Sequence, residues 1–249
     1  MGFFSRLFRD KSSEPTPTQA EPVEKPPAFP YELASVPGEN AVRQALRWRE
    51  EWRGSCTPVI LGSIKNFDFL TDVWTEIKES PEEFVERAKN ISLEEWFAKR
   101  LEESVSLDEL TDASAWNPGR ATEDDFATVR DILTRRFHPQ VWIAKVPTAQ
   151  PCDVPAWLKL GGWNACPAAE EHAAVWRYWQ ERYGAEILCV TGDVIEATVS
   201  RPPKEKEACY ALAREQFAYC EDIVTQGVGS VDALASGLYG ASSWFFWWD

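Results

Sequence analysis

The sequence has little of what common enzyme chemistries require. It has two histidines in 249 residues and no GxxxxGK(S/T), GxGxxG or HExxH motif. The phosphate-binding and zinc-protease mechanisms that depend on those motifs therefore lack their residues. The six cysteines form no CxxC pair, so neither a disulfide framework nor a zinc site of that spacing is indicated. We expect no metal ion and no cofactor.

Long apolar runs are also missing. No stretch approaches the ~20 apolar residues that a membrane-spanning helix needs, and no signal peptide precedes the chain. We therefore expect a cytoplasmic protein with reduced thiols and no integral membrane association. Residues 1–9, which are aromatic and basic, can make a weak peripheral contact with an anionic membrane if they are helical, but a frayed chain end is the simpler interpretation.

Positive charge is scarce. The chain has 26 Lys and Arg against 40 Asp and Glu, a formal net charge of −14. Nucleic-acid binding depends on Lys and Arg that release counterions from phosphates, so we expect no nucleic-acid partner. Residues 76–131 alone carry 16 acidic and 7 basic side chains. A partner attracted by this charge would be a basic protein.

Aromatic residues, by contrast, are abundant. The chain has 13 Trp and 13 Phe, which indicates an interior built from aromatic side chains. Six prolines between residues 12 and 30 indicate a linker that cannot bury enough surface to order itself. We therefore divide the chain into a disordered proline-rich tail (1–30), an acidic and mainly helical part (31–150) and a C-terminal domain (151–249). Whether the last two are one domain or two is left open.

In the first half, residues 39–53 are expected to form a helix with Val42, Leu46 and Trp52 on a shared face. The apolar runs 57–62 and 140–146 are expected to be strands. Between them the same helix-start signal occurs four times, a hydroxyl three residues before a carboxylate. These signals begin at Ser80, Ser92, Ser106 and Thr122.

In the second half, Cys166-Pro167 is expected to open a helix that ends at Gly184. Gly192-Asp193 joins two alternating segments, which predicts a β-hairpin over 186–200. A helix to about Cys220 and a final helix capped by Ser230 should follow, before an aromatic last strand that buries its rings. Together these elements predict an α/β (α+β) fold, a mixed sheet that contains a hairpin and has helices packed on it.

The last third of the chain resembles a known family. The segments that carry the resemblance are Gly161-Gly162-Trp163-Asn164-Ala165-Cys166-Pro167, Tyr183-Gly184-Ala185-Glu186, Arg201-Pro202-Pro203, ALAREQFAYCED at 211–222 and Trp244-Phe245-Phe246-Trp247-Trp248-Asp249. In order and composition they are similar to the domain of unknown function 4253 family of uncharacterised bacterial proteins, with residues 57–62 as a weak upstream extension. The resemblance implies a fold but no mechanism.

Cys166 is the best single candidate nucleophile, because a thiol at a helix N-terminus can have a lowered pKa. Its nearest histidine in sequence, His172, would lie roughly 120° around the same helix, so the two should not form a dyad. His138 can approach only through the tertiary fold. A small buried cysteine that caps the helix is the simpler interpretation. Glu215 and Asp222 are further catalytic candidates, but they lie about two helical turns apart.

Several polar residues lie beside aromatic segments, where they must be hydrogen-bonded or functional. These candidate binding residues are Asn164, Arg201, Glu215, Gln216 and Asp249. Asp193 is explained by its hairpin turn and Glu196 by a solvent-facing strand position. Cys209 and Cys220 are about 16 Å apart along one helix and should not share a zinc ion.

Two functional hypotheses follow. The first is a non-enzymatic protein-interaction protein with a basic partner, for example an immunity-like toxin neutraliser. The second is an enzyme whose Cys/carboxylate/Arg site gathers residues from separate elements within about 4 to 6 Å of one another. Those residues would be Asn164, Cys166, Arg201, Glu215 and Asp222.

Overall fold

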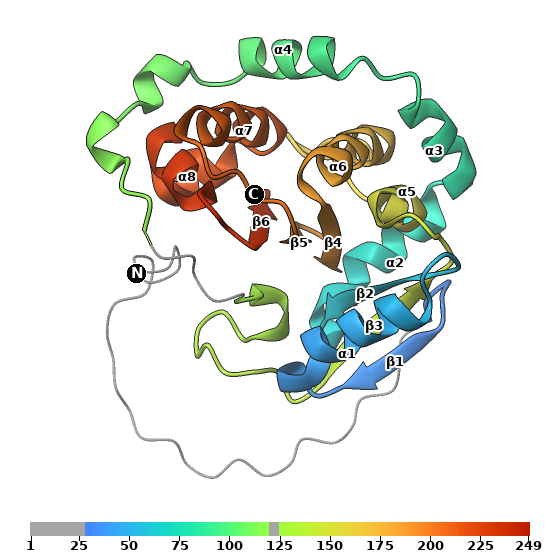
Figure 1. Cartoon of the computed structure of the whole chain (residues 1–249). Coiled ribbons are helices and arrows are strands. Elements are labelled where there is room, and N and C mark those ends of the chain that lie inside the picture. The colour runs from blue at the N-terminus through green and yellow to red at the C-terminus, as the bar shows by residue number, and fades with distance from the viewer. Residues whose placement is uncertain (1–27, 120–124) are drawn as a thin grey trace.

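The protein is built on one mixed β-sheet (Figure 1). The computed structural model describes residues 28–119 and 125–249, so most of the predicted tail lies outside the described residues. The six strands of the sheet are arranged in the order β1-β3-β2-β4-β5-β6. Their bounds are β1 Leu33–Val36, β2 Thr57–Gly62, β3 Val141–Val146, β4 Ala185–Val190, β5 Val194–Val199 and β6 Ser243–Trp247.

The predicted fold class is confirmed. The central strands β2 and β4 pair in parallel, while each of the other neighbouring pairs is antiparallel. The β4-β5 pair is the predicted hairpin. The sheet continues across the predicted boundary between residues 150 and 151, because β1, β2 and β3 precede it and the other strands follow it. The four-residue strand β1 was not expected from the sequence.

Helices cover both faces of the sheet. Helices α2, α5, α6, α7 and α8 contribute to the larger core on one face, and α1 packs on the other. Their bounds, with α3 and α4, are α1 Gly38–Glu51, α2 Phe67–Glu76, α3 Pro81–Ala88, α4 Leu93–Glu103, α5 Val154–Leu158, α6 Ala169–Tyr183, α7 Lys206–Tyr219 and α8 Val231–Leu238. Among the described residues, none of these helices is both long and apolar enough to cross a membrane.

The predicted apolar face of α1 is wrong in part, because Val42 packs against the smaller core but Trp52 follows the end of the helix. The helix buries Ala41 and Ala45, whereas Leu46 is 37% exposed. The start of the helix also lies close to other backbone, since a Cβ on Gly38 would be 2.7 Å from the Val129 carbonyl oxygen.

Part of the acidic stretch forms an arc around the helices of the larger core. This acidic belt (residues 77–117) contains α3, α4 and the 3-10 turns Leu107–Leu110 and Ala113–Ala115 (Figure 1). The capping box at Ser80 is confirmed, since its hydroxyl accepts from the Glu83 N–H and its own N–H donates to the Glu83 carboxylate. Helical turns also follow Ser92 and Ser106, but neither side chain makes a capping hydrogen bond. Thr122 lies outside the described residues.

The C-terminal elements largely match their predictions. Helix α8 follows Ser230, whose hydroxyl accepts a hydrogen bond of 3.1 Å from the Ala233 N–H. The last strand β6 pairs with β5 and buries Trp244 and Phe246, whereas Phe245 and Trp247 are half-buried, so the predicted burial of its rings is confirmed for alternate residues. A π-helix at Ile223–Val228, between α7 and α8, was not foreseen.

Candidate functional site

The structure brings together two residues that the sequence seemed to separate. The Sγ of Cys166 lies 3.4 Å from Nε2 of His172, although we expected them on different sides of one helix. That expectation was wrong because α6 begins at Ala169. Cys166 precedes the helix in a loop that folds back over its first turn, so the 100° rotation per helical residue does not apply to it.

The hydrogen bonds around His172 favour one of its two neutral tautomers. The Tyr219 hydroxyl lies 2.6 Å from Nδ1 of His172 and 2.8 Å from Nε1 of Trp176. An indole N–H can only donate, so the hydroxyl accepts from Trp176, and Nδ1 of His172 is the acceptor within reach of the hydroxyl's own proton. The imidazole proton is then on Nε2, where it points toward the sulfur. His172 therefore has no lone pair directed at Cys166 with which to remove the thiol proton.

Burial also opposes thiolate formation. Cys166 is 5% exposed, and burial raises the pKa of its thiol well above the ordinary value. Burial and the nearby charge of Arg100 lower the pKa of His172 to about 3. Both groups are neutral near pH 7, whereas an activated cysteine is a thiolate in an electropositive, partly exposed place. The pair acts as a packed polar contact and lacks the features of a nucleophile with its base.

We expect one fast-reacting thiol in the native protein at pH 7.5. Cys56 is partly exposed, while the other five cysteines are buried. Burial also raises the pKa of both Cys152 and Cys220 to about 12. Titration with a chromogenic disulfide reagent should find one thiol before unfolding and all six in denaturant. The variant Cys56→Ser should show none in the native state, and rapid labelling of that variant would contradict the burial of Cys166.

Three of the predicted polar residues meet at one edge of the sheet. The side-chain amide of Asn164 donates to the carbonyl of Asp249 at 3.1 Å, and the N–H of Asp249 donates to the Asp222 carboxylate at 3.1 Å. Asn164 has φ of +44°, a left-handed conformation that asparagine tolerates better than most residues. These contacts attach the end of the chain to the loop before α6 and to the end of α7.

The other predicted residues make separate contacts. Arg201 donates to the carbonyls of Gln180 and Glu181 in the last turn of α6. Glu215 accepts from the Tyr178 hydroxyl and the Trp179 indole, at 2.8 and 2.9 Å. Gln216 is buried, and its amide nitrogen has no hydrogen-bond partner among the described residues. Arg201 and Glu215 therefore bind groups of α6, and neither of them contacts Cys166.

The sequence analysis missed one buried carboxylate. Glu196, placed on a solvent-facing strand position, is 2% exposed and accepts from the N–H groups of Ala127 and Thr128 at 2.6 and 3.0 Å. The expectation failed because the segment that covers β5 comes from a distant part of the chain. Burial raises the pKa of Glu196 above its usual value of 4.5, and the hydrogen bonds from Thr128 and Ala127 oppose this shift only partly.

Because its pKa is raised, the contribution of Glu196 to the free energy of unfolding depends on pH. The folded state holds this proton more tightly than the unfolded state does. The resulting stabilisation is complete below about pH 4.5 and is lost as the pH rises through the folded-state pKa. We expect the stability of wild type relative to Glu196→Gln to increase as the pH falls from 7 toward 4.5. Denaturant unfolding of both proteins at several pH values measures this difference, and parallel pH profiles would contradict it.

The acidic belt is attached to the domain through its inner side. On α4, Leu93, Trp96, Phe97 and Leu101 pack against the larger core. The Trp96 indole donates to the Glu171 carboxylate at 2.8 Å. Further along the belt, the N–H of Asp112 donates to Asp232 at 2.7 Å. Apolar packing therefore occupies the inner side and leaves the charges on the outer one.

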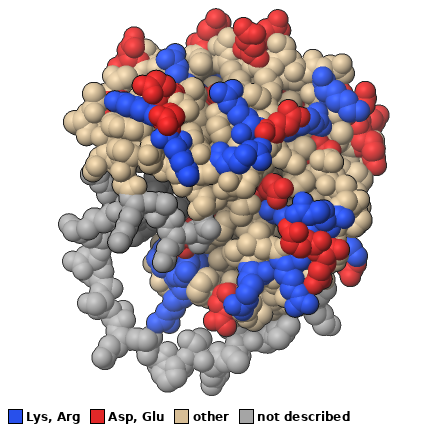
Figure 2. Space-filling model, viewed as in Figure 1, with Lys and Arg blue, Asp and Glu red and all other residues tan. Residues whose placement is uncertain are grey.

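The outer side of the belt carries most of its charge. Residues 77–117 contain eleven acidic and five basic side chains. Of the basic ones, Arg100 turns inward to the carbonyls of Ala218 and Ala165. Glu94, Glu95 and Glu102 are exposed and form no ion pair with another described residue. Figure 2 shows acidic side chains gathered along the end of the molecule where α4 lies.

Metal binding has no support from this arrangement. In the described part of the chain, no group of three or more His, Cys, Asp or Glu side chains could hold a metal ion. The shallow pocket beside α3 and α6 has a volume of about 420 Å³ and is lined by residues such as Arg87 and Glu170, which pair with each other at 2.9 Å. The third charged group of the lining, Glu171, accepts hydrogen bonds from the Trp96 indole and the Ala168 N–H.

Comparison with known proteins identifies the C-terminal part of the chain. No curated protein and no solved structure matched the sequence. Residues 142–249 match the family described as Domain of unknown function (DUF4253). The match starts in β3, upstream of the segments that suggested the family, and includes the Cys166–His172 contact and the aromatic last strand. The C-terminal portion of this protein is therefore a DUF4253 domain.

Proposed function

We propose that the protein acts without catalysis, by binding a basic protein partner through the outer side of the acidic belt. The observation that carries this proposal is the row of exposed glutamates on α4, which no neighbouring cation neutralises among the described residues. Charged groups arranged in this way steer an oppositely charged partner and favour it over others. The DUF4253 match assigns no function of its own.

The attachment of the belt supports this role. A flexible acidic segment would lose conformational entropy on binding, whereas a belt already packed on the core presents its charges in fixed positions. Trp96 and Arg100 both hold α4 against the domain. A partner whose basic surface is its active surface would be blocked by such contact. In a bacterial cytoplasm, a basic toxin would be such a partner, and the protein would then be immunity-like.

The test compares two variants with the same change in charge. Glu94→Gln/Glu95→Gln/Glu102→Gln alters the outer side of α4. The control Glu39→Gln/Glu50→Gln/Glu51→Gln alters exposed residues of α1. Each tagged protein is used for affinity capture from cells of the source organism, with mass spectrometry at low and high salt.

The proposal expects basic proteins to be recovered by wild type and by the α1 control, and to be lost with the α4 variant. The recovered complex should weaken as the salt concentration rises, because exposed charges more than ~10 Å apart are screened at 0.1 M ionic strength. Equal recovery by all three proteins, or a partner that is acidic, would overturn the proposal.

A further inference from the structure

A short turn between residues 130 and 138 presents apolar side chains to solvent. Ile132 is 57% exposed, Leu133 74% and Phe137 41%, which makes this finger loop (residues 130–138) the most apolar exposed segment of the described chain. Soluble proteins tolerate single exposed apolar residues, but several together on one protrusion indicate a contact surface.

The finger loop is held in one shape by its own polar groups. Asp131 accepts hydrogen bonds from the N–H groups of Leu133 and Thr134, at 3.2 and 2.8 Å, and so closes the turn beneath the apolar tip. The guanidinium of Arg130 lies 3.7 Å from the centroid of the Phe137 ring. Asp125 pairs with Arg130 at 2.8 Å and also with Arg135. The exposure of Ile132 and Leu133 is therefore imposed by an ordered turn.

The base of the loop is anchored to the sheet. Buried Glu196 accepts from Ala127 and Thr128, immediately before the loop. At its other end, the N–H of Gly38 donates to the His138 carbonyl at 3.0 Å. A loop fixed at both ends pays little conformational entropy when its tip is buried by a partner.

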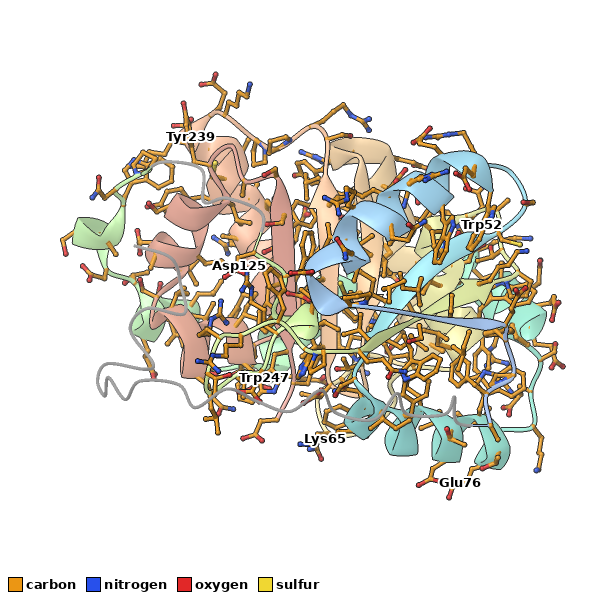
Figure 3. All side chains as sticks on the ribbon, turned by 90° about the horizontal axis from the view of Figure 1, so that it is seen from below. Trp52, Lys65, Glu76, Asp125, Tyr239 and Trp247 are labelled. Atoms are coloured by element: carbon orange, nitrogen blue, oxygen red, sulfur yellow. The ribbon has the colours of Figure 1, made fainter. Side chains whose placement is uncertain are left out.

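The cations beside the tip outnumber its acidic groups, although the protein as a whole has a net charge of −14. The loop contains Arg130, Arg135 and Arg136, and Asp125 pairs with the first two, so Arg136 is the arginine of the loop that has no ion pair with another described residue. Burial and the charge of nearby Lys65 lower the pKa of His138, so a further cation lies beside the loop. Figure 3 labels Lys65 on the turn after β2. An anionic surface complements this arrangement.

We propose that the finger loop docks on an anionic lipid surface, with Ile132 and Leu133 entering the boundary between headgroups and acyl chains. A convex tip needs a matching cavity in a protein partner, but a fluid bilayer opens around it. Arginines beside inserted apolar side chains attract anionic headgroups. In Figure 1 the yellow-green segment that contains the loop lies away from α4, so the acidic belt need not approach the same surface.

A second apolar and basic segment is available in the sequence. Residues 1–9 include three phenylalanines, one leucine and two arginines. Membrane association through one weak element is marginal, and stable attachment takes two. The finger loop is the contact that the structure supplies, and it alone carries this proposal. This proposal does not depend on the acidic belt or on a protein partner.

The test is sedimentation of the full chain with vesicles. One set of vesicles is pure phosphatidylcholine, and the other contains about a third phosphatidylglycerol. Ile132→Ser/Leu133→Ser removes the apolar tip, and Leu46→Ser is the matched control on α1, where the side chain is also exposed. Circular dichroism confirms that each variant is folded, which is expected because neither change reaches the core.

Wild type and Leu46→Ser should sediment with the vesicles that contain phosphatidylglycerol and should not sediment with the pure phosphatidylcholine vesicles. The finger variant should bind them at least about tenfold more weakly, and deletion of residues 1–9 should weaken binding without removing the effect of the finger. Failure of wild type to sediment, equal binding to both vesicle types, or unchanged binding of the finger variant would overturn the proposal. A photocrosslinker at position 133 that captures a protein and no lipid would also overturn it, in favour of a protein contact.

Discussion

Replacing Trp179 with alanine is expected to lower the free energy of unfolding by about 3–5 kcal/mol, the range for large aromatic truncations in a packed core. Trp179 is fully buried on α6. Its ring stacks on Phe246 of β6 at 5.5 Å and meets Tyr219 of α7 edge-on at 5.0 Å. The ring therefore joins two helices to the edge strand of the sheet, and its removal leaves a cavity between them.

A polar loss adds to the cavity. The Trp179 indole donates to Glu215, so the alanine variant also removes one hydrogen-bond donor from that carboxylate. Trp52→Ala is the control, because Trp52 is only partly buried and stacks on Trp48 at the end of α1. Chemical denaturation of both variants measures the difference. A loss below about 1 kcal/mol for Trp179→Ala would mean that the aromatic cluster is not the centre of the core.

Most elements could be predicted where their signals are local. Gly192-Asp193 between two alternating segments predicted the hairpin, and Ser230 predicted the start of α8. Both signals act within a few residues, so nothing elsewhere in the chain had to be known. Strand β1 could not be predicted in this way, because four residues carry too little pattern. Its partner strand β3 is more than one hundred residues away in sequence.

The site residues were harder to predict, because their surroundings are set by tertiary contacts. The alternating pattern of β5 assigns Glu196 to the solvent side of the strand, yet the segment around Thr128 covers it. Cys166 and His172 were kept apart by a helix boundary placed three residues too early. For Glu196, the partner that decides its chemistry comes from a distant segment whose position the sequence does not specify.

The residues that match DUF4253 do not include all strands of the sheet. The matched residues contain most of β3 and all of β4, yet these strands are not neighbours, because β2 lies between them. Strand β2 comes from Thr57–Gly62, far upstream of the match. The sheet of the C-terminal domain is therefore completed by the first half of the chain.

Replacing Gly161 with alanine should be nearly as damaging as the loss of Trp179. Gly161 has φ of +95°, and a Cβ there would lie 1.8 Å from the Pro167 carbonyl oxygen and 2.8 Å from Nε2 of His172. Backbone strain of ~1–3 kcal/mol and overpacking of ~1–3 kcal/mol then combine to a loss of about 4 kcal/mol. Denaturant unfolding measures it.

Gly162→Ala separates the two contributions. Gly162 has φ of +80°, but a Cβ there would meet nothing within 4 Å, so it should cost only the strain of ~1–3 kcal/mol. The loop that contains both glycines also covers Cys166. In Gly161→Ala the native thiol titration should therefore rise from one group to two, while Gly162→Ala keeps one. Equal stability of the two variants, or an unchanged thiol count in Gly161→Ala, would mean that the loop yields to the methyl group without uncovering the cysteine. The contact between His172 and the Cys166 sulfur would then be independent of how closely His172 packs against Gly161.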